Sequence, residues 1–79
     1  MANSITVDQV SSKAIGERIR AARKAADVNQ TEVAVAVGVT STTVARWELG
    51  HASPYLEHIV KIANLLGVDA RKLAFGTEG

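Results

Sequence analysis

The sequence has no cysteine, a single proline and only three aromatic residues among its 79 positions. Without cysteine there are no disulfide bonds and no thiolate metal sites. With so few aromatic rings, a core must be built mainly from aliphatic side chains, which are plentiful because 47% of the residues are hydrophobic. No apolar run approaches the roughly 20 residues that cross a bilayer, and the start lacks the basic residues of a secretion signal. We therefore expect one small cytoplasmic domain with no membrane contact.

Neither sign of charge dominates, because the formal net charge is only +1. The charge is unevenly distributed, however. Residues 13–27 carry five basic side chains against two acidic ones, a local excess of +3. Such a run usually marks the solvated face of a helix. A cluster of basic side chains would also serve contact with nucleic-acid phosphates.

Hydrophobic periodicity and capping signals predict about five short helices. The expected helices are 11–27, 30–37, 41–49, a fourth that starts at Ser53-Pro54 and ends at Gly67, and a last turn after Asp69. The fourth carries an apolar stripe that begins at Leu56. The expected organisation is a flexible segment over 1–12, a helical domain over 13–75 and a tail over 76–79.

A strand is the competing interpretation of residues 33–37, because valine and alanine alternate there and valine favours strands. Two observations argue for a helix. Asn29 followed three residues later by Glu32 is typical of a helix start, where each side chain pairs with a backbone amide of the other residue. No second strand candidate lies nearby to pair with the first.

The stretch 30–49 predicts two helices joined by a tight turn at Gly38, a residue that can take a left-handed backbone conformation without steric cost. Ala34 is small where the helices would cross, and Val39 is apolar beside the turn. After the turn, Val44 and Trp47 are three residues apart and share one helix face. The face that they leave open would enter a DNA groove.

Residues 15–75 resemble the helix-turn-helix domain of the phage repressor and Cro family, also called the xenobiotic-response-element family. The residues that match the family pattern in register are Gln30, Ala34, Gly38, Val39, Val44, Trp47, Glu48 and Gly50. The resemblance implies an all-α, lambda-repressor-like bundle that binds double-stranded DNA.

The resemblance also implies roles for individual side chains. The residues expected to read base edges are Ser41, Thr42, Ala45 and Arg46. Those expected to contact phosphates are Gln30, Thr40 and Thr43. Arg23 and Glu48 correspond to an ion pair that ties the first helix to the end of the third. Arg46 is the main candidate for specificity, because a guanidinium that pairs with guanine contributes about 1–3 kcal/mol of discrimination.

The sequence departs from the family pattern in two places. Val35 and Ala36 are apolar on the outer face of their helix, where polar residues are usual. The loop 49–52 lacks the lysine or arginine that often contacts phosphate there.

No enzyme chemistry is expected. His51 and His58 do not have the spacing of a metal site, and no general base stands beside the hydroxyls of residues 40–43. We expect neither a metal nor another cofactor.

These observations predict that the chain is a sequence-specific regulator of transcription that binds double-stranded DNA as a homodimer. We expect it to be a repressor. The dimer contact is expected near Leu65, Val68, Leu73 and Phe75. The alternative is a protein-interaction module, such as an antitoxin or a transcription adaptor, whose protein partner covers the apolar patch at Val35 and Ala36.

Overall fold

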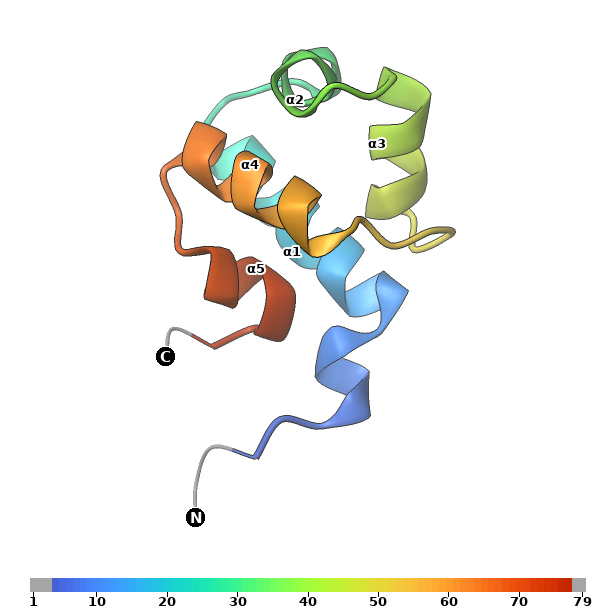
Figure 1. Ribbon diagram of the computed structural model, residues 1–79, viewed down its shortest axis with the longest axis vertical. Coiled ribbons are helices and arrows are strands. Elements are labelled where there is room, and N and C mark those ends of the chain that lie inside the picture. Colours follow the sequence, from blue (N-terminus) through green and yellow to red (C-terminus); the bar gives the residue numbers. More distant parts are fainter. Residues whose placement is uncertain (1–3, 78–79) are drawn as a thin grey trace.

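The computed structural model describes residues 4–77, and within them all regular structure is helical (Figure 1). The elements are a 3-10 helix η1 (Val7–Val10) and the α-helices α1 (Ser12–Ala25), α2 (Gln30–Val37), α3 (Ser41–Glu48), α4 (Leu56–Leu66) and α5 (Ala70–Phe75). The expected all-α bundle is confirmed. Residues 33–37 belong to α2, so the strand interpretation was wrong.

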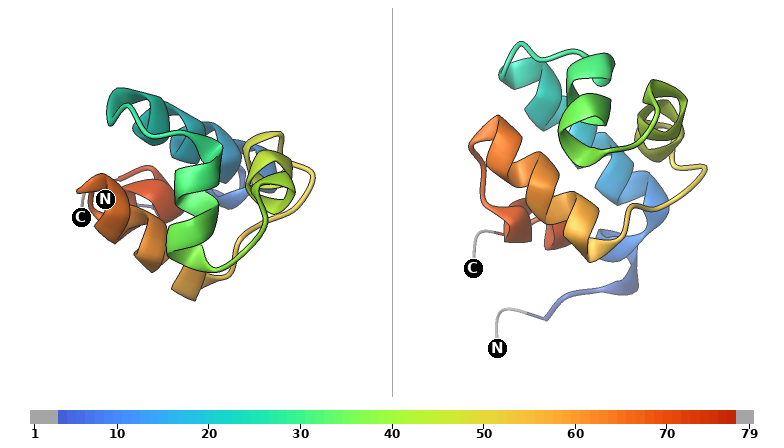
Figure 2. Two further views of the ribbon diagram at one scale, coloured as in Figure 1. Left: turned by 90° about the horizontal axis from the view of Figure 1, so that it is seen from above. Right: turned by 45° about the horizontal axis from the view of Figure 1, so that its top comes forward.

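The long helix α1 packs against α3, α4 and α5. Helix α2 packs against α3 and α4, and α4 lies in front of α1 in Figure 1. The views in Figures 1 and 2 agree that α3 and α5 lie on opposite sides of the molecule.

The core is aliphatic, as the scarcity of aromatic residues predicted. Its buried members are Ile15, Ile19, Val33, Ala34, Val37, Val44, Trp47, Ile59, Ile62, Ala63, Leu73 and Ala74. Trp47 supplies the one ring in this set. Its ring centroid lies 5.1 Å from that of His58, which brings the end of α3 against the start of α4.

Helix α1 begins as expected, because the Ser11 hydroxyl accepts a hydrogen bond from the backbone N–H of Ala14. Before α1, residues 7–10 of the segment that was expected to be flexible form the helix η1. The Gln9 side-chain amide donates to the carbonyl oxygen of Phe75 at 2.8 Å, which ties η1 to the end of α5. Residues 1–3 and 78–79, which belong to the expected flexible ends, lie outside the described residues. The domain limits of 13–75 stay a prediction.

The expected start of α4 at Ser53-Pro54 was wrong, since α4 begins at Leu56. The Ser53 hydroxyl is hydrogen-bonded with that of Ser12, and Pro54 is buried. The His58 Nδ1 atom instead accepts from the Tyr55 N–H at 3.1 Å and completes the helix start. A contact with a residue 41 positions earlier thus competed with the local capping signal.

Two apolar side chains also lie differently from the expectation. Leu56 is 70% exposed, because it stands on the first turn of α4, before the buried stripe that Ile59 begins. Leu73 is only 1% exposed, because it belongs to the buried core. Leu73 is therefore excluded from the expected dimer contact.

Candidate nucleic-acid interface

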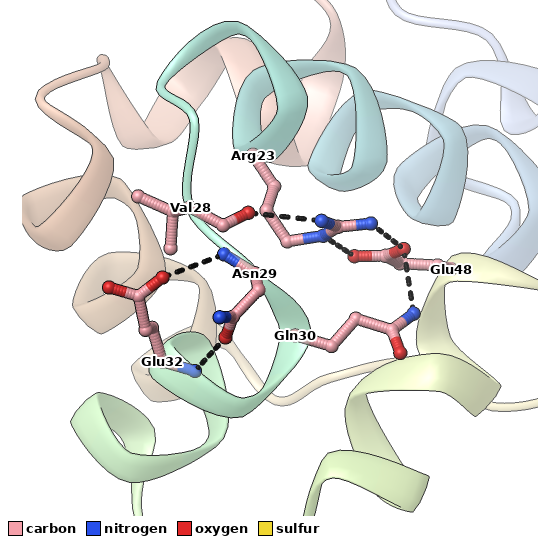
Figure 3. Close-up of polar contacts among 6 residues, drawn as sticks. All are labelled: Arg23, Val28, Asn29, Gln30, Glu32 and Glu48. Atoms are coloured by element: carbon pink, nitrogen blue, oxygen red, sulfur yellow. Dashed lines mark hydrogen bonds and ion pairs between the residues drawn. The ribbon is translucent and has the colours of Figure 1, made fainter.

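The start of α2 is held by reciprocal hydrogen bonds, as the sequence predicted (Figure 3). The Asn29 side chain accepts from the backbone N–H of Glu32 at 2.8 Å, and the Glu32 carboxylate accepts from the N–H of Asn29 at 2.9 Å. These bonds satisfy backbone donors that have no partner inside the helix. They fix the backbone just before Gln30, the first residue of α2.

The turn between α2 and α3 is made by Gly38, which has a φ of 88° and ends α2 in the left-handed conformation. No atom lies within 4 Å of the position that a Cβ would take there, so backbone conformation rather than space favours glycine. Val39 follows, half-buried against the core. The turn therefore has the geometry that the sequence indicated.

Helix α3 is amphipathic and presents a polar side to solvent. Thr40 caps it, accepting from the backbone N–H of Thr43 at 3.1 Å. Val44 and Trp47 are buried at 0% and 3% exposure, whereas Arg46 lies on the exposed side. The other residues expected at base edges are also accessible: Ser41 and Thr42 are exposed and Ala45 is half-buried.

The end of α3 is anchored to α1 by a two-point ion pair (Figure 3). The Nε atom of Arg23 lies 2.7 Å from Oε2 of Glu48, and its second terminal nitrogen lies 3.0 Å from Oε1. The remaining terminal nitrogen donates to the carbonyl oxygen of Val28 at 3.0 Å. Two parallel bonds restrict orientation as well as distance. The expected contact between Arg23 and Glu48 is thus present in the structure.

Burial makes this ion pair sensitive to the loss of either member. The side chains of Arg23 and Glu48 are only 12% and 3% exposed. The hydrogen bond that Arg23 donates to the Glu48 carboxylate raises the pKa of Arg23, and burial opposes that shift. Removing one member would leave the other charge buried without compensation, which is strongly unfavourable.

Gln30 also belongs to this cluster, which the sequence analysis did not foresee. Its side-chain amide nitrogen donates to Oε1 of Glu48 at 3.1 Å (Figure 3). The first residue of α2 is thereby tied to the last residue of α3. An amide nitrogen carries two hydrogens, so one donor remains beyond the Glu48 contact.

Fewer basic side chains of α1 are available to contact phosphates than the count of basic residues suggested. Arg23 is paired with Glu48, and Arg18 binds backbone carbonyl groups. Arg18 donates to the carbonyl oxygens of Leu73 at 2.8 Å and Ala74 at 2.9 Å, in the last turn of α5. Desolvation by burial lowers the pKa of Arg18. Both arginines hold the fold together, and Lys13, Arg20 and Lys24 are the exposed basic residues of this helix.

The exposed residue Lys13 lies beside the loop 49–52, which has no lysine or arginine. A Cβ placed on Gly50 would stand 2.9 Å from Cα of Lys13, so the first turn of α1 touches the loop after α3. Lys13 is exposed. The sequence analysis missed this residue, because its proximity to Gly50 joins positions 37 apart and no local pattern reports it.

The described residues hold no cluster of metal-ligating side chains. Among residues 4–77, no group of three histidine, aspartate or glutamate side chains could hold a metal ion. The Thr40 and Thr43 hydroxyls lie 3.0 Å apart and serve the cap of α3. No helix within the described range is long and apolar enough to span a membrane.

The tight turn at Gly38, the buried face of α3 and its exposed polar side define a helix-turn-helix protein. Residues 19–73, more than half of the chain, match the helix-turn-helix family, and the chain belongs to it. The expected resemblance to phage repressors is confirmed by the relatives found.

Two curated relatives come from phage or prophage DNA. The chain is 39% identical over 61 residues to the cryptic phage CTXphi transcriptional repressor RstR of Vibrio cholerae, covering 77% of this chain and 55% of that protein. It is 34% identical over 62 residues to an uncharacterized HTH-type transcriptional regulator of Bacillus subtilis, YonR, derived from prophage SPbeta, covering 78% and 57%. The chain thus spans little more than half the length of these relatives.

A solved structure supports the same fold. The P22 c2 repressor, crystallised in complex with a synthetic operator, superposes with a TM-score of 0.72 at 30% identity. The match covers 80% of this chain and 96% of that one.

Proposed function

We propose that the chain is a sequence-specific regulator of transcription that binds double-stranded DNA and reads the major groove with α3. The observation that carries this proposal is the exposed polar side of α3, which the buried pair of Arg23 and Glu48 anchors to α1. A groove-reading helix must keep a fixed orientation while its outer side chains remain accessible. The structure meets both requirements in one element.

The proposed base contacts come from one side of α3. Arg46 bonds guanine O6 and N7 together, and the short side chains of Ser41 and Thr42 accept several base edges. Ala45 contacts a thymine methyl group. Because one long side chain carries most of the discrimination, selectivity is modest at the other positions.

The proposed phosphate contacts surround α3. The second amide hydrogen of Gln30 points to phosphate while the first bonds Glu48. Thr40 and Thr43 contribute hydroxyl groups at the start of the helix. We add Lys13, because it stands beside a loop that has no lysine or arginine of its own. Lys13 replaces the cation that this loop lacks.

The relatives favour repression over activation and argue against an enzyme. One relative is named a transcriptional repressor, and the P22 c2 repressor was crystallised with an operator. We therefore propose a cytoplasmic repressor that needs no cofactor. We also propose that it acts as a homodimer, because two half-sites about 34–36 Å apart multiply the discrimination of a single helix.

Selection of bound duplexes from a random DNA pool tests the function, with the wild-type chain and Arg46→Ala compared. The wild-type chain is expected to recover an inverted repeat with half-sites one helical turn apart. Arg46→Ala is expected to lose the preference at one base pair of each half-site, equivalent to about 1–3 kcal/mol. Arg71→Ala on α5 is the control, since it removes an exposed arginine from the helix on the opposite side of the molecule from α3. A pool without consensus, or an unchanged consensus with Arg46→Ala, would refute the proposal.

The second candidate function is binding of a protein partner at the outer face of α2. Val35 is 78% exposed, and with Ala36 and Leu65 it lines a shallow groove of about 450 Å³ between α2 and α4. Val35→Lys distinguishes the two functions. It would abolish partner binding and leave DNA selection unchanged, whereas Arg46→Ala would do the reverse.

A further inference from the structure

One side of α4 combines exposed apolar and charged residues. Leu56 is 70% exposed and Val60 is 48% exposed. Residues four apart lie on the same side of a helix, so these two form an apolar pair. Glu57 and Lys61 follow them by one position each and are also exposed. We call these four residues the α4 surface.

Nothing in the described part of the chain covers this surface. The buried side of α4 is a different one, formed by Ile59, Ile62 and Ala63. In Figure 1, α4 lies in front of α1, so the side of α4 that faces away from α1 is open. Within residues 4–77, neither Glu57 nor Lys61 takes part in an ion pair. The α4 surface therefore has an apolar pair and two charges of opposite sign, all without partners among the described residues.

We infer that the α4 surface binds a second copy of this chain about a two-fold axis. A two-fold axis makes each contact occur twice, with residue i touching j and j touching i. A surface can therefore bind its own copy when each charge lies opposite a charge of the other sign on the second copy. An axis that passes beside α4, level with the midpoint between Glu57 and Lys61, brings each of them opposite the other residue of the second copy. Leu56 and Val60 then bury their side chains beside two reciprocal ion pairs.

The apolar groove between α2 and α4 does not meet this condition. The groove at Val35 and Leu65 has one charged residue, Glu32. The Glu32 carboxylate already accepts the backbone N–H of Asn29. A two-fold axis through this groove would bring two glutamates together without a cation. Charge complementarity thus favours α4 over this groove, and α5 contributes less than expected because Leu73 is buried.

This inference rests on the proposal that the chain acts as a dimer, and it names the surface that joins the two copies. The surface lies on α4, whereas the proposed base contacts lie on α3. Pairing through α4 therefore leaves the polar side of α3 accessible in both copies. Loss of pairing would leave each chain able to contact a single half-site, only more weakly.

Exchange of the two charges tests the inference by sedimentation equilibrium. Glu57→Lys alone places two lysines opposite two lysines, and Lys61→Glu alone places glutamates opposite glutamates. Each variant is expected to dissociate at a concentration about tenfold or more higher than the wild-type dimer does. An equal mixture of the two variants is expected to form a one-to-one heterodimer, because every contact again joins a lysine with a glutamate. A defect in folding would not be repaired by mixing.

The controls separate this surface from the rest of the molecule. Val35→Lys, at a more exposed valine outside the α4 surface, is expected to dimerise as the wild-type chain does. Circular dichroism checks that all variants keep their helices. A monomeric wild-type chain would overturn the inference, as would unimpaired single variants or a mixture that remains monomeric. Binding of the same variants to a single half-site duplex is measured in parallel. Retained half-site binding beside a failed dimer test would refute the surface and leave the DNA-reading function standing.

Discussion

Gly16 of α1 lies directly against the carbonyl oxygen of Trp47 in α3, so closely that a Cβ at position 16 would overlap it. The two helices therefore meet through their backbones at this point. Gly16 stands one helical turn after Lys13 in α1, and Trp47 immediately precedes Glu48 in α3. It sets the distance of α3 from α1, as the ion pair of Arg23 and Glu48 sets its orientation.

Gly16→Ala is expected to destabilise the fold by about 1–3 kcal/mol, because the added methyl group would force α1 and α3 apart. Helix propensity alone predicts the opposite, since alanine stabilises a helix interior by about 0.5–1 kcal/mol relative to glycine. Urea unfolding followed by circular dichroism distinguishes the two. Gly38→Asn is the control, because no atom lies near its Cβ position and asparagine tolerates the left-handed conformation. Unchanged or increased stability of Gly16→Ala would contradict the close contact.

Arg23→Met is expected to cost about 3–5 kcal/mol of unfolding free energy, because Glu48 would remain charged and buried beside the Gln30 amide alone. The double variant Arg23→Met with Glu48→Met should recover much of this loss, since no buried charge is left. The same urea unfolding measures both variants. Arg71→Met, which removes an exposed partner of Asp69, provides the comparison and should change stability little. Additive losses in the double variant would show that the two residues are not coupled.

Lys13→Gln is expected to weaken DNA binding uniformly across sequences. It should also lower the magnitude of the slope of log affinity against log salt concentration by about one, because one phosphate contact is lost. Fluorescence anisotropy at several salt concentrations measures this slope. Arg71→Gln is the control, since it removes a cation from α5, on the opposite side of the molecule from α3. An unaltered slope for Lys13→Gln would exclude Lys13 from the interface.

The contribution of Asp69, the cap of α5, to the stability of the fold should depend on pH. Hydrogen bonds from the side chain and then the backbone of Arg71 hold the pKa of the Asp69 carboxyl below its usual 3.8. The charged form therefore stabilises the fold above that usual value, and the contribution disappears as pH falls through the lower folded pKa. The stability difference between the wild-type chain and Asp69→Asn should thus be largest near neutral pH and shrink in acid. A difference that grows in acid would contradict this assignment.

Local signals predicted the centre of the molecule well. The bounds of α2, the caps at Asn29 and Thr40, and the stop at Gly38 all follow from neighbouring residues. The same kind of signal failed at Ser53-Pro54, where the hydroxyl pairs with Ser12 instead. A capping signal predicts a helix start only when no distant residue takes its hydrogen-bonding group.

By itself, the sequence determined the helical class, the turn at Gly38 and which side of α3 is apolar, because these depend on spacing along the chain. The tertiary structure alone decided which charges remain available. Arg18 and Arg23 are taken up by the fold, whereas Lys13 lies next to Gly50. It also decided that Leu73 is buried and Leu56 exposed. Burial and pairing depend on segments far apart in the sequence, and periodicity within one helix does not report which neighbour will cover it.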